Sequence, residues 1–280
     1  MKSILSKDER MFAMASAIIL GIFALISFAP FMLIAISSIS STKSLVTKGY
    51  SFFPSSLSLD SYLYMLAQGK IILRSYGVSF FVTTVGTITS LIITPMLAYP
   101  LSRKDFKLRG LFTFLVFFSL LFNGGVVPSY IMWARLFSLK NTIWALIIPT
   151  YLMYGFNVLL VKNYFEGLPE ELEESARIDG CSRWGAFYRI TLPLLRPGLL
   201  AGSVLVFANI WNEFVLGYAL VLSDEVRLVQ VGIYANVTEV GIRWGPLTAA
   251  AIGASLPVVI AYAFMQRAFI QGLSAGAVKG

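Results

Sequence analysis

The chain has 280 residues, of which 57% are hydrophobic and 13% are charged, and its mean hydropathy is +0.77. These values lie outside the range of ordinary soluble domains and predict a membrane protein. The net charge of +8 comes from basic residues in short segments between apolar runs, so we interpret it as a topology signal and expect no nucleic-acid partner. The chain has no histidine and one cysteine, Cys181, which excludes imidazole chemistry and an internal disulfide.

Six apolar stretches follow one another along the chain. Each is long enough to cross about 30 Å of hydrocarbon at about 1.5 Å per residue, and none alternates like a barrel strand, so we predict an all-α membrane protein. A cleaved signal peptide is the alternative for the first stretch, but that stretch is longer than the apolar core of a signal peptide. The predicted spans of this single transmembrane domain, residues 1–280, are 11–38, 75–101, 110–132, 141–161, 197–222 and 245–267.

The distribution of Lys and Arg predicts the orientation of these spans. If both termini face the cytoplasm, fourteen of the 22 basic residues lie in cytoplasmic segments and eight lie outside. Basic residues are enriched on the cytoplasmic side of bacterial membrane proteins. We therefore expect a multi-pass plasma-membrane protein with both termini in the cytoplasm, and residues 169–196 on the same side.

Residues 169–196, which we call the coupling segment, form a charged stretch between the fourth and fifth spans. Pro169 suits the first position of a helix, acidic residues fill its early turns, and Gly180 is placed for a left-handed stop. Ser182 can then cap a second helix that runs to Pro193. A DNA-reading helix pair is excluded because the leading helix is acidic, whereas a plain amphipathic loop on the headgroups stays an alternative.

The spacing in the coupling segment resembles the EAA loop of ABC importer permeases. The family pattern is Glu-Ala-Ala, three residues, Gly, nine residues, and then Ile-x-Leu-Pro, and here only the middle Ala differs, being Ser175. The resemblance implies that the two helices dock into a cleft on a cytoplasmic ATPase subunit. The residues that it assigns to this coupling are Glu174, Ser175, Ala176, Asp179, Gly180, Ile190, Leu192 and Pro193.

Other segments extend the resemblance to carbohydrate permeases of the MalG type. The C-terminal stretch "MQRAFIQGLSAGAVKG" and the stretch "WNEF" at 211–214 are similar to segments of that group, and "FNGGVVPSY" at 122–130 looks more like the LplC and YtcP type. The resemblance implies a type I ABC importer permease fold of six transmembrane helices and transport of an oligosaccharide. It also implies three kinds of partner: a second, different permease, an ATPase dimer and an external solute-binding protein.

The chain shows no loop that would bind ATP. The Walker pattern G-x-x-x-x-G-K-S/T does not occur, and the single Gly-Lys pair, Gly69-Lys70, is followed by Ile71. We expect no enzyme activity and no cofactor in this chain, with ATP and Mg²⁺ on the partner ATPase. The alternatives are a permease for a peptide or polyamine and an ion-coupled secondary carrier, which would need ionisable groups near the bilayer centre.

Polar residues within the predicted spans are candidates for a substrate path. Amide and carboxylate groups suit sugar hydroxyls, and aromatic rings suit the apolar faces of sugar rings. Hydrogen bonding between helices is the alternative role for such residues. The candidates are Asn209, Asn212 and Glu213 at positions i, i+3 and i+4 with the neighbouring Trp211, then Tyr154 and Asn157, and Asn123 before a Gly124-Gly125 pair where the helix could break.

Overall fold

The computed structural model describes residues 7–122, 124–151, 153–234, 237–238 and 241–277. The described chain is mainly helical, with one short antiparallel hairpin in which Val237 pairs with Ile242 and Thr238 with Gly241. It forms two compact units, one built from residues 1–69 and 233–255 and the other from residues 70–232 and 256–280.

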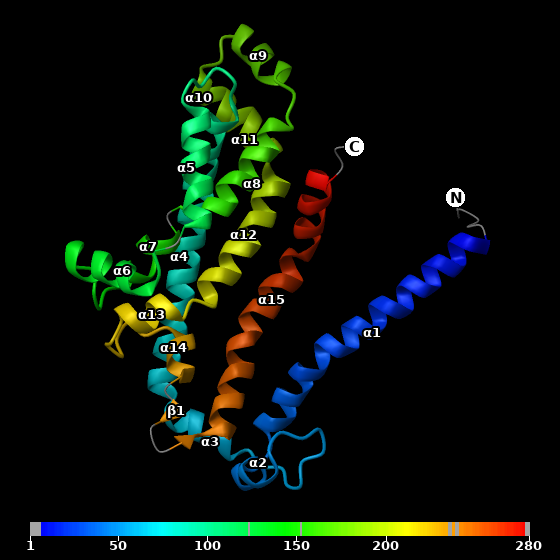
Figure 1. Ribbon diagram of the computed structural model, residues 1–280, viewed down its shortest axis with the longest axis vertical. Coiled ribbons are helices and arrows are strands. Elements are labelled where there is room, and N and C mark those ends of the chain that lie inside the picture. Colours follow the sequence, from blue (N-terminus) through cyan, green and yellow to red (C-terminus); the bar gives the residue numbers. More distant parts are fainter. Residues whose placement is uncertain (1–6, 123, 152, 235–236, 239–240, 278–280) are drawn as a thin grey trace. The chain divides into compact units, whose positions relative to one another are not determined.

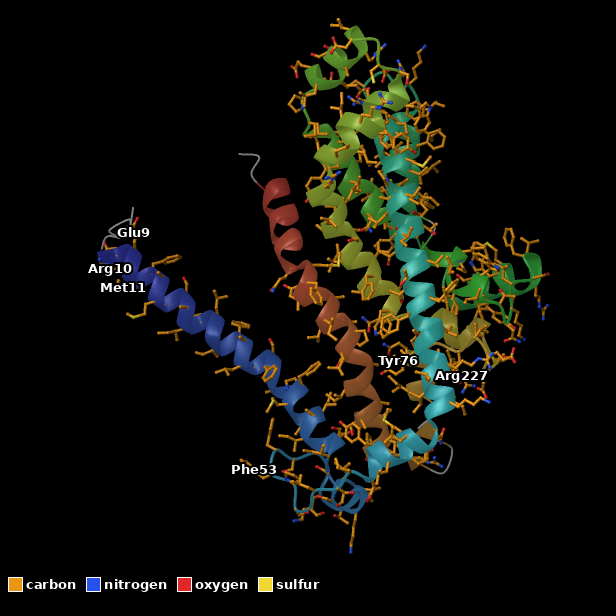
Figure 2. The ribbon with its side chains drawn as sticks, turned by 180° about the vertical axis from the view of Figure 1, so that it is seen from behind. Glu9, Arg10, Met11, Phe53, Tyr76 and Arg227 are labelled. Atoms are coloured by element: carbon orange, nitrogen blue, oxygen red, sulfur yellow. The ribbon has the colours of Figure 1, made fainter. Side chains whose placement is uncertain are left out.

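The first unit contains helices α1 (Lys7–Ser38), α2 (Thr42–Lys48) and α3 (Asp60–Ala67), strands β1 (Val237–Thr238) and β2 (Gly241–Ile242), and the start of α15 (Trp244–Ala277). Apolar side chains on all sides of α1 are exposed, as Figure 2 shows, which is typical of a helix that faces lipid. Polar and aromatic contacts join the other parts of the first unit. Ser38 Oγ lies 2.8 Å from Tyr62 Oη, and the rings of Tyr50 and Trp244 meet edge to face.

The second unit holds the remaining helices. They are α4 (Gly69–Ser102), α5 (Arg109–Leu121), α6 (Val126–Tyr130), the π-helix η1 (Ile131–Leu136), the 3-10 helix η2 (Ile143–Leu146), α7 (Ile148–Tyr151), α8 (Gly155–Glu166), α9 (Glu171–Ile178), α10 (Arg183–Ala186), the π-helix η3 (Phe187–Thr191), α11 (Leu192–Leu194), α12 (Arg196–Trp211), α13 (Val215–Leu220), α14 (Val229–Tyr234) and the rest of α15. Figure 1 shows α4, α5, α8 and α12 running along one another, with α9 and α10 beyond one end.

Two clusters of buried apolar side chains stabilise the second unit. The first cluster joins α4 to η2, α12 and α13, and it includes Val82, Leu146, Ile210 and Leu220. The second cluster lies nearer α9 and joins α4, α5 and α8 to η3. Its members are Ala98, Leu101, Val116, Val158, Val161, Phe165, Phe187 and Leu195.

Three helices of the described chain are each long and apolar enough to cross a membrane: α1, α4 and residues 244–266 of α15. They fall on the first, second and sixth predicted spans. Two bent helix pairs pass the same test together, residues 109–121 with 126–136 and residues 183–194 with 198–211. The described residues therefore hold between three and five candidate spans, and the count of six stays a prediction.

The predicted third, fourth and fifth spans are broken in the structure. The third breaks at the predicted position, since α5 ends at Leu121, α6 begins at Val126, and Gly125 has a φ of 84° that favours glycine. Residues 141–161 were expected as one helix but form η2, α7 and the start of α8. The predicted fifth span, residues 197–222, is likewise not one continuous helix, because α12 ends at Trp211 and α13 begins at Val215.

A substitution at Gly198 tests the close approach of α8 and α12. A Cβ at Gly198 would lie 2.8 Å from the ring of Tyr164, so the ring or a helix must move. We expect Gly198→Ala to lower the free energy of unfolding by about 1–3 kcal/mol and to lower the melting temperature of the detergent-solubilised protein. The control is Gly77→Ala, since no atom lies within 4 Å of a Cβ there. Equal melting temperatures for the two variants would contradict this packing.

Candidate functional site

The coupling segment forms the predicted helix, glycine turn and second helix. Helix α9 carries Glu171, Glu173 and Glu174 in its first turn, where the helix dipole stabilises negative charge. Gly180 follows the helix with a φ of 83°, a left-handed conformation that costs other residues about 1–2 kcal/mol. Ser182 Oγ then accepts a hydrogen bond from the Gly185 amide at 3.1 Å and caps α10.

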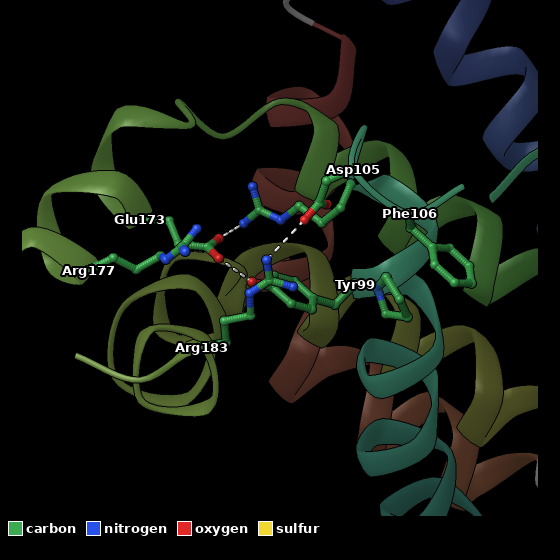
Figure 3. A pocket seen from close by; sticks show the side chains of 8 residues that line it. Tyr99, Asp105, Phe106, Glu173, Arg177 and Arg183 are labelled. Carbon is green, nitrogen blue, oxygen red and sulfur yellow. Dashed lines mark hydrogen bonds and ion pairs between the residues drawn. The ribbon is translucent and has the colours of Figure 1, made fainter. Parts of the chain in front are cut away.

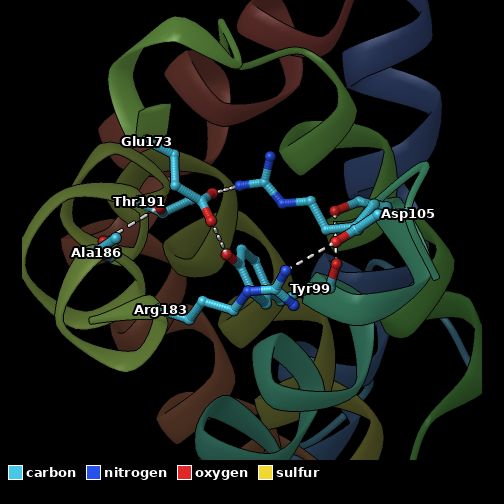
Figure 4. A network of polar contacts seen from close by, with 8 residues as sticks. Tyr99, Asp105, Glu173, Arg183, Ala186 and Thr191 are labelled. Atoms are coloured by element: carbon cyan, nitrogen blue, oxygen red, sulfur yellow. Dashed lines mark hydrogen bonds and ion pairs between the residues drawn. The ribbon is translucent and has the colours of Figure 1, made fainter. Parts of the chain in front are cut away.

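The second helix continues beyond α10 through a π-helical turn. The Thr191 hydroxyl donates a hydrogen bond to the Ala186 carbonyl at 3.2 Å, across the wider turn of η3 (Figure 4). Pro193 lies in α11 directly after this turn and leads into α12. The second half of the coupling segment therefore consists of three consecutive short helices, α10, η3 and α11, which lead into α12.

Phe187 anchors the coupling segment to the helix bundle. Its side chain is 2% exposed, and its ring lies 4.9 Å from the ring of Tyr99 on α4 and 6.2 Å from that of Phe165 on α8. Tyr99 and Phe165 also meet each other edge to face at 5.4 Å. Burying an aromatic ring among others contributes a few kcal/mol, so this cluster fixes the second helix of the segment to two long helices.

A polar network lies beside this aromatic cluster (Figures 3 and 4). The carboxylate of Glu173 accepts a hydrogen bond from the Tyr99 hydroxyl and pairs with the guanidinium of Arg103. That guanidinium lies 4.7 Å from the centre of the Tyr99 ring, a cation–π arrangement. The network borders a cavity of about 210 Å³, whose lining residues are Tyr99, Pro100, Arg103, Asp105, Phe106, Glu173, Arg177 and Arg183.

Two further ion pairs join the same chain segments at the surface. Asp105 pairs with Arg183 at 3.2 Å, and Lys104 pairs with Glu170 at 3.1 Å. All four side chains are more than half exposed, so water and salt weaken these pairs, and each contributes at most about 1 kcal/mol.

The other side of the coupling segment is exposed and partly apolar. Ile178 is 86% exposed and Trp184 is 62% exposed, and the ring of Trp184 stacks at 6.0 Å on that of the exposed Tyr188. Large apolar side chains rarely gather on a free surface, so this face fits a protein partner. Of the predicted coupling residues, Glu174, Ser175, Asp179 and Gly180 are exposed, Ile190, Leu192 and Pro193 are half-buried, and Ala176 is buried.

Sequence reasoning missed the residues that hold this segment in place. In the sequence, Glu173 is one of several acids in a first helical turn, and Arg103 and Lys104 indicate only the orientation of the spans. A signal was present, because an acidic helix and a basic loop were both expected on the cytoplasmic side. Only the folded chain brings Tyr99 and Glu173, which lie 74 residues apart, into contact.

The predicted polar stripe at residues 209–213 does not lie on one continuous helix. Asn209 and Asn212 are exposed at the end of α12, and the side chain of Asn212 donates to the Ala208 carbonyl at 2.8 Å. Glu213 lies beyond the helix end, where its carboxylate accepts a hydrogen bond from the Leu216 amide at 3.0 Å and caps α13. Asn209 and Glu213 therefore do not share one face of a continuous helix as expected, because α12 ends at Trp211, between them.

Trp211 is buried, in contrast to the expected role of its ring in a substrate path. The side chain is 1% exposed and its ring lies 5.0 Å from the ring of Phe80 and stacks at 6.3 Å on that of Phe207. A ring covered in this way cannot contact a substrate in this conformation. It instead packs the end of α12 against α4.

The remaining candidates for the substrate path differ in their burial. Asn157 is buried in α8 and its amide donates to the Gly202 carbonyl of α12 at 3.4 Å, the interhelical role that was the alternative. Tyr154 is half-buried at the N-terminal end of α8. Asn123 lies outside the described residues, and a substrate role for any of these residues stays a prediction.

Comparison with known protein families and structures identifies the family of this chain. Residues 73–275 match the family described as the inner membrane component of binding-protein-dependent transport systems. The chain belongs to this family. The resemblance to ABC importer permeases is thereby confirmed, and so is a multi-pass membrane protein with several apolar helices.

Individual relatives match over almost the whole chain. Protein LplC of Bacillus subtilis (strain 168) is 37% identical, with 98% of this chain and 97% of the relative covered. The polygalacturonan/rhamnogalacturonan transport system permease protein YtcP of the same organism is 34% identical, with 97% and 99% covered. A solved bacterial ABC transporter involved in the import of the acidic polysaccharide alginate contains a chain with a TM-score of 0.79 and 29% identity, with 95% and 99% covered.

Two aromatic residues of the coupling segment should differ sharply in their effect on stability. Phe187→Ala removes a buried ring and should lower the free energy of unfolding by about 3–5 kcal/mol, whereas Trp184→Ala removes an exposed ring. We expect thermal unfolding in detergent to show a large loss of stability for the first variant and almost none for the second. A larger loss for Trp184→Ala than for Phe187→Ala would contradict the described arrangement.

Proposed function

We propose that this chain is one of two permease subunits of an ATP-driven importer for an oligosaccharide. The observation that carries the proposal is the coupling segment, which is anchored to the bundle through Phe187 and exposes Glu174, Ile178 and Trp184 on its other side. A segment that is fixed on one side and open on the other suits the transfer of movement from a partner to the membrane helices. Family membership supports this role.

In this proposal the energy comes from a separate ATPase dimer that holds ATP and Mg²⁺. The exposed face of α9 and α10 docks into that dimer, with Glu174 as its charged contact and Gly180 as the turn between the two helices. When ATP closes the dimer, the docked segment moves with it, and the two permeases change from an inward-facing to an outward-facing state. This chain then supplies half of the path and no catalytic group.

The proposed topology has six spans, with both termini and the coupling segment in the cytoplasm. A second permease of different sequence completes the path, and an external solute-binding protein delivers the substrate from the other side. The excess of Lys and Arg in residues 103–109 supports this orientation, and two of these basic residues, Arg103 and Lys104, contact the coupling segment.

The transport functions of two relatives support an oligosaccharide as substrate. YtcP carries polygalacturonan or rhamnogalacturonan in its name, and the solved transporter imports alginate. The exposed amides of Asn209 and Asn212 supply hydrogen-bonding groups of the kind that bind sugar hydroxyls. A permease for a peptide or polyamine is the second candidate of the same architecture.

Reconstituted vesicles test the coupling assignment. With the binding protein, both permeases and the ATPase present, we expect Glu174→Ala combined with Gly180→Val to abolish ATP-driven oligosaccharide uptake, because a contact and a turn are lost together. Glu171→Ala is the matched control, an exposed acid on the same helix that should keep full uptake. Full uptake by the double variant would contradict the assignment.

The same vesicles separate the importer from an ion-coupled carrier. Uptake by the importer should stop when the ATPase is omitted and should persist when ionophores dissipate the proton and sodium gradients. Uptake that survives without the ATPase and collapses with an ion gradient would overturn the proposal. Labelled peptides and polyamines, offered in place of the oligosaccharide, distinguish the two substrate classes.

A further inference from the structure

Glu173 and Glu174 are adjacent on α9 but serve different sides of the helix. Neighbouring residues of an α-helix point about 100° apart, so only one of the two can face the bundle. The side chain of Glu173 is 14% exposed and contacts α4, whereas Glu174 is exposed and makes no ion pair with any residue that the structure describes. The acid of the family motif is therefore free for a partner, and its neighbour is held within the chain.

One partner of Glu173, Tyr99, lies in the last turn of α4, and the other, Arg103, directly follows the end of that helix. The Tyr99 hydroxyl donates to the Glu173 carboxylate, and the Arg103 guanidinium, 24% exposed, pairs with the same carboxylate while lying over the Tyr99 ring. Charge-assisted bonds between largely buried groups are stronger than surface ion pairs, and breaking one leaves an uncompensated charge. The interaction of Glu173 with Tyr99 and Arg103 is thus stronger than the exposed ion pairs Lys104–Glu170 and Asp105–Arg183.

Helix α4 reaches from this contact to the far part of the same unit. It is continuous from Gly69 to Ser102, about 50 Å at 1.5 Å per residue. Near its other end, Ser79 Oγ accepts a hydrogen bond from the Val229 amide at 2.8 Å, and Val82 packs in one cluster with Leu220. Helix α4 therefore connects this contact to α13 and α14, which contain Leu220 and Val229.

We propose that Glu173, Tyr99 and Arg103 form a clamp, here called the Glu173 clamp, that transmits movement of the coupling segment to α4. The inference rests on the proposed function and adds a second route to it. The first route runs along the chain from the coupling segment into α12, while the clamp connects α9 to a helix that is remote in sequence. The three residues are positioning residues, since they contact neither ATP nor substrate in the proposed mechanism.

Charge reversal with rescue tests the clamp. In vesicles that contain the complete importer, Glu173→Arg should lower ATP-driven uptake by about tenfold or more, because it places two guanidinium groups together. The ATPase should still copurify with the permeases, because the exposed face of α9 and α10 is unchanged. Stimulation of ATP hydrolysis by the loaded binding protein should be lost. Arg103→Glu in the same chain should restore most of the uptake and the stimulation.

Milder variants and a matched control keep the test decisive if charge reversal prevents assembly. Glu173→Gln retains a side chain of the same shape and should lower uptake severalfold while the complex assembles. Glu170→Arg reverses an acid of the same segment whose ion pair with Lys104 is exposed, and it should leave uptake within about twofold of the unmodified protein.

Two results would overturn the clamp. One is full uptake by both Glu173→Arg and Glu173→Gln, and the other is a loss of uptake in Glu173→Arg that Arg103→Glu does not relieve while Glu173→Gln transports normally. Neither result contradicts the proposed function, which is tested separately by the variant with Glu174 and Gly180 replaced. If that variant loses uptake and the Glu173 variants do not, the coupling segment acts without the Glu173 clamp, through α12 or through the contacts of Phe187 with α4 and α8.

Discussion

The burial of Phe187 between Tyr99 and Phe165 is the contact that holds α9, α10 and η3 in place at this end of the second unit. These three rings belong to three separate parts of the chain, so their packing is what holds the coupling segment against α4 and α8. Their packing also excludes water from one side of the network formed by Glu173 and Arg103. An ion pair in full contact with water would be weak, whereas beside a buried aromatic cluster it is stronger.

The coupling segment thereby has two faces with opposite properties. One face, with Ala176, Ala186 and Phe187, is buried and joined to the bundle. The opposite face, with Ile178 and Trp184, leaves apolar surface in water, which costs free energy until a partner covers it. In the proposed mechanism, this division allows a subunit without an ATP-binding loop to respond to a separate ATPase: the exposed face would take up the movement, and the buried face would pass it to the membrane helices.

Local patterns in the sequence predicted the features that depend on neighbouring residues. Long apolar runs gave α1, α4 and α15, the Gly124-Gly125 pair predicted the end of α5, and Gly180 with Ser182 predicted the turn and cap of the coupling segment. Such features follow from the conformational freedom of glycine, from capping hydrogen bonds and from the thickness of the bilayer, and all three can be judged from a few residues.

Features that depend on tertiary contacts could not be predicted. The break between α12 and α13 places Glu213 at a helix start, whereas the polar residues at this point of the sequence predicted a stripe on one continuous helix. Burial of Trp211 depends on Phe80, which lies on another helix, and the role of Glu173 depends on Tyr99 and Arg103. The family motif includes the exposed Glu174 and the buried Ala176 of α9, but Glu173 lies outside the pattern, so the motif gives no sign of its contact with Tyr99 and Arg103.

The distance between α9 and the loop after α4 shows whether these two parts move together. Spin labels at Glu171→Cys on α9 and Lys107→Cys, both exposed positions, can be introduced into a chain with Cys181→Ser and measured by double electron–electron resonance in the assembled importer. If the coupling segment and the end of α4 move together, the mean distance between the spin labels stays the same with and without bound ATP. The distribution of this distance becomes broader when Glu173→Arg is added. A distance that changes by several ångströms as ATP binds would show that α9 moves independently of α4 and would contradict the account.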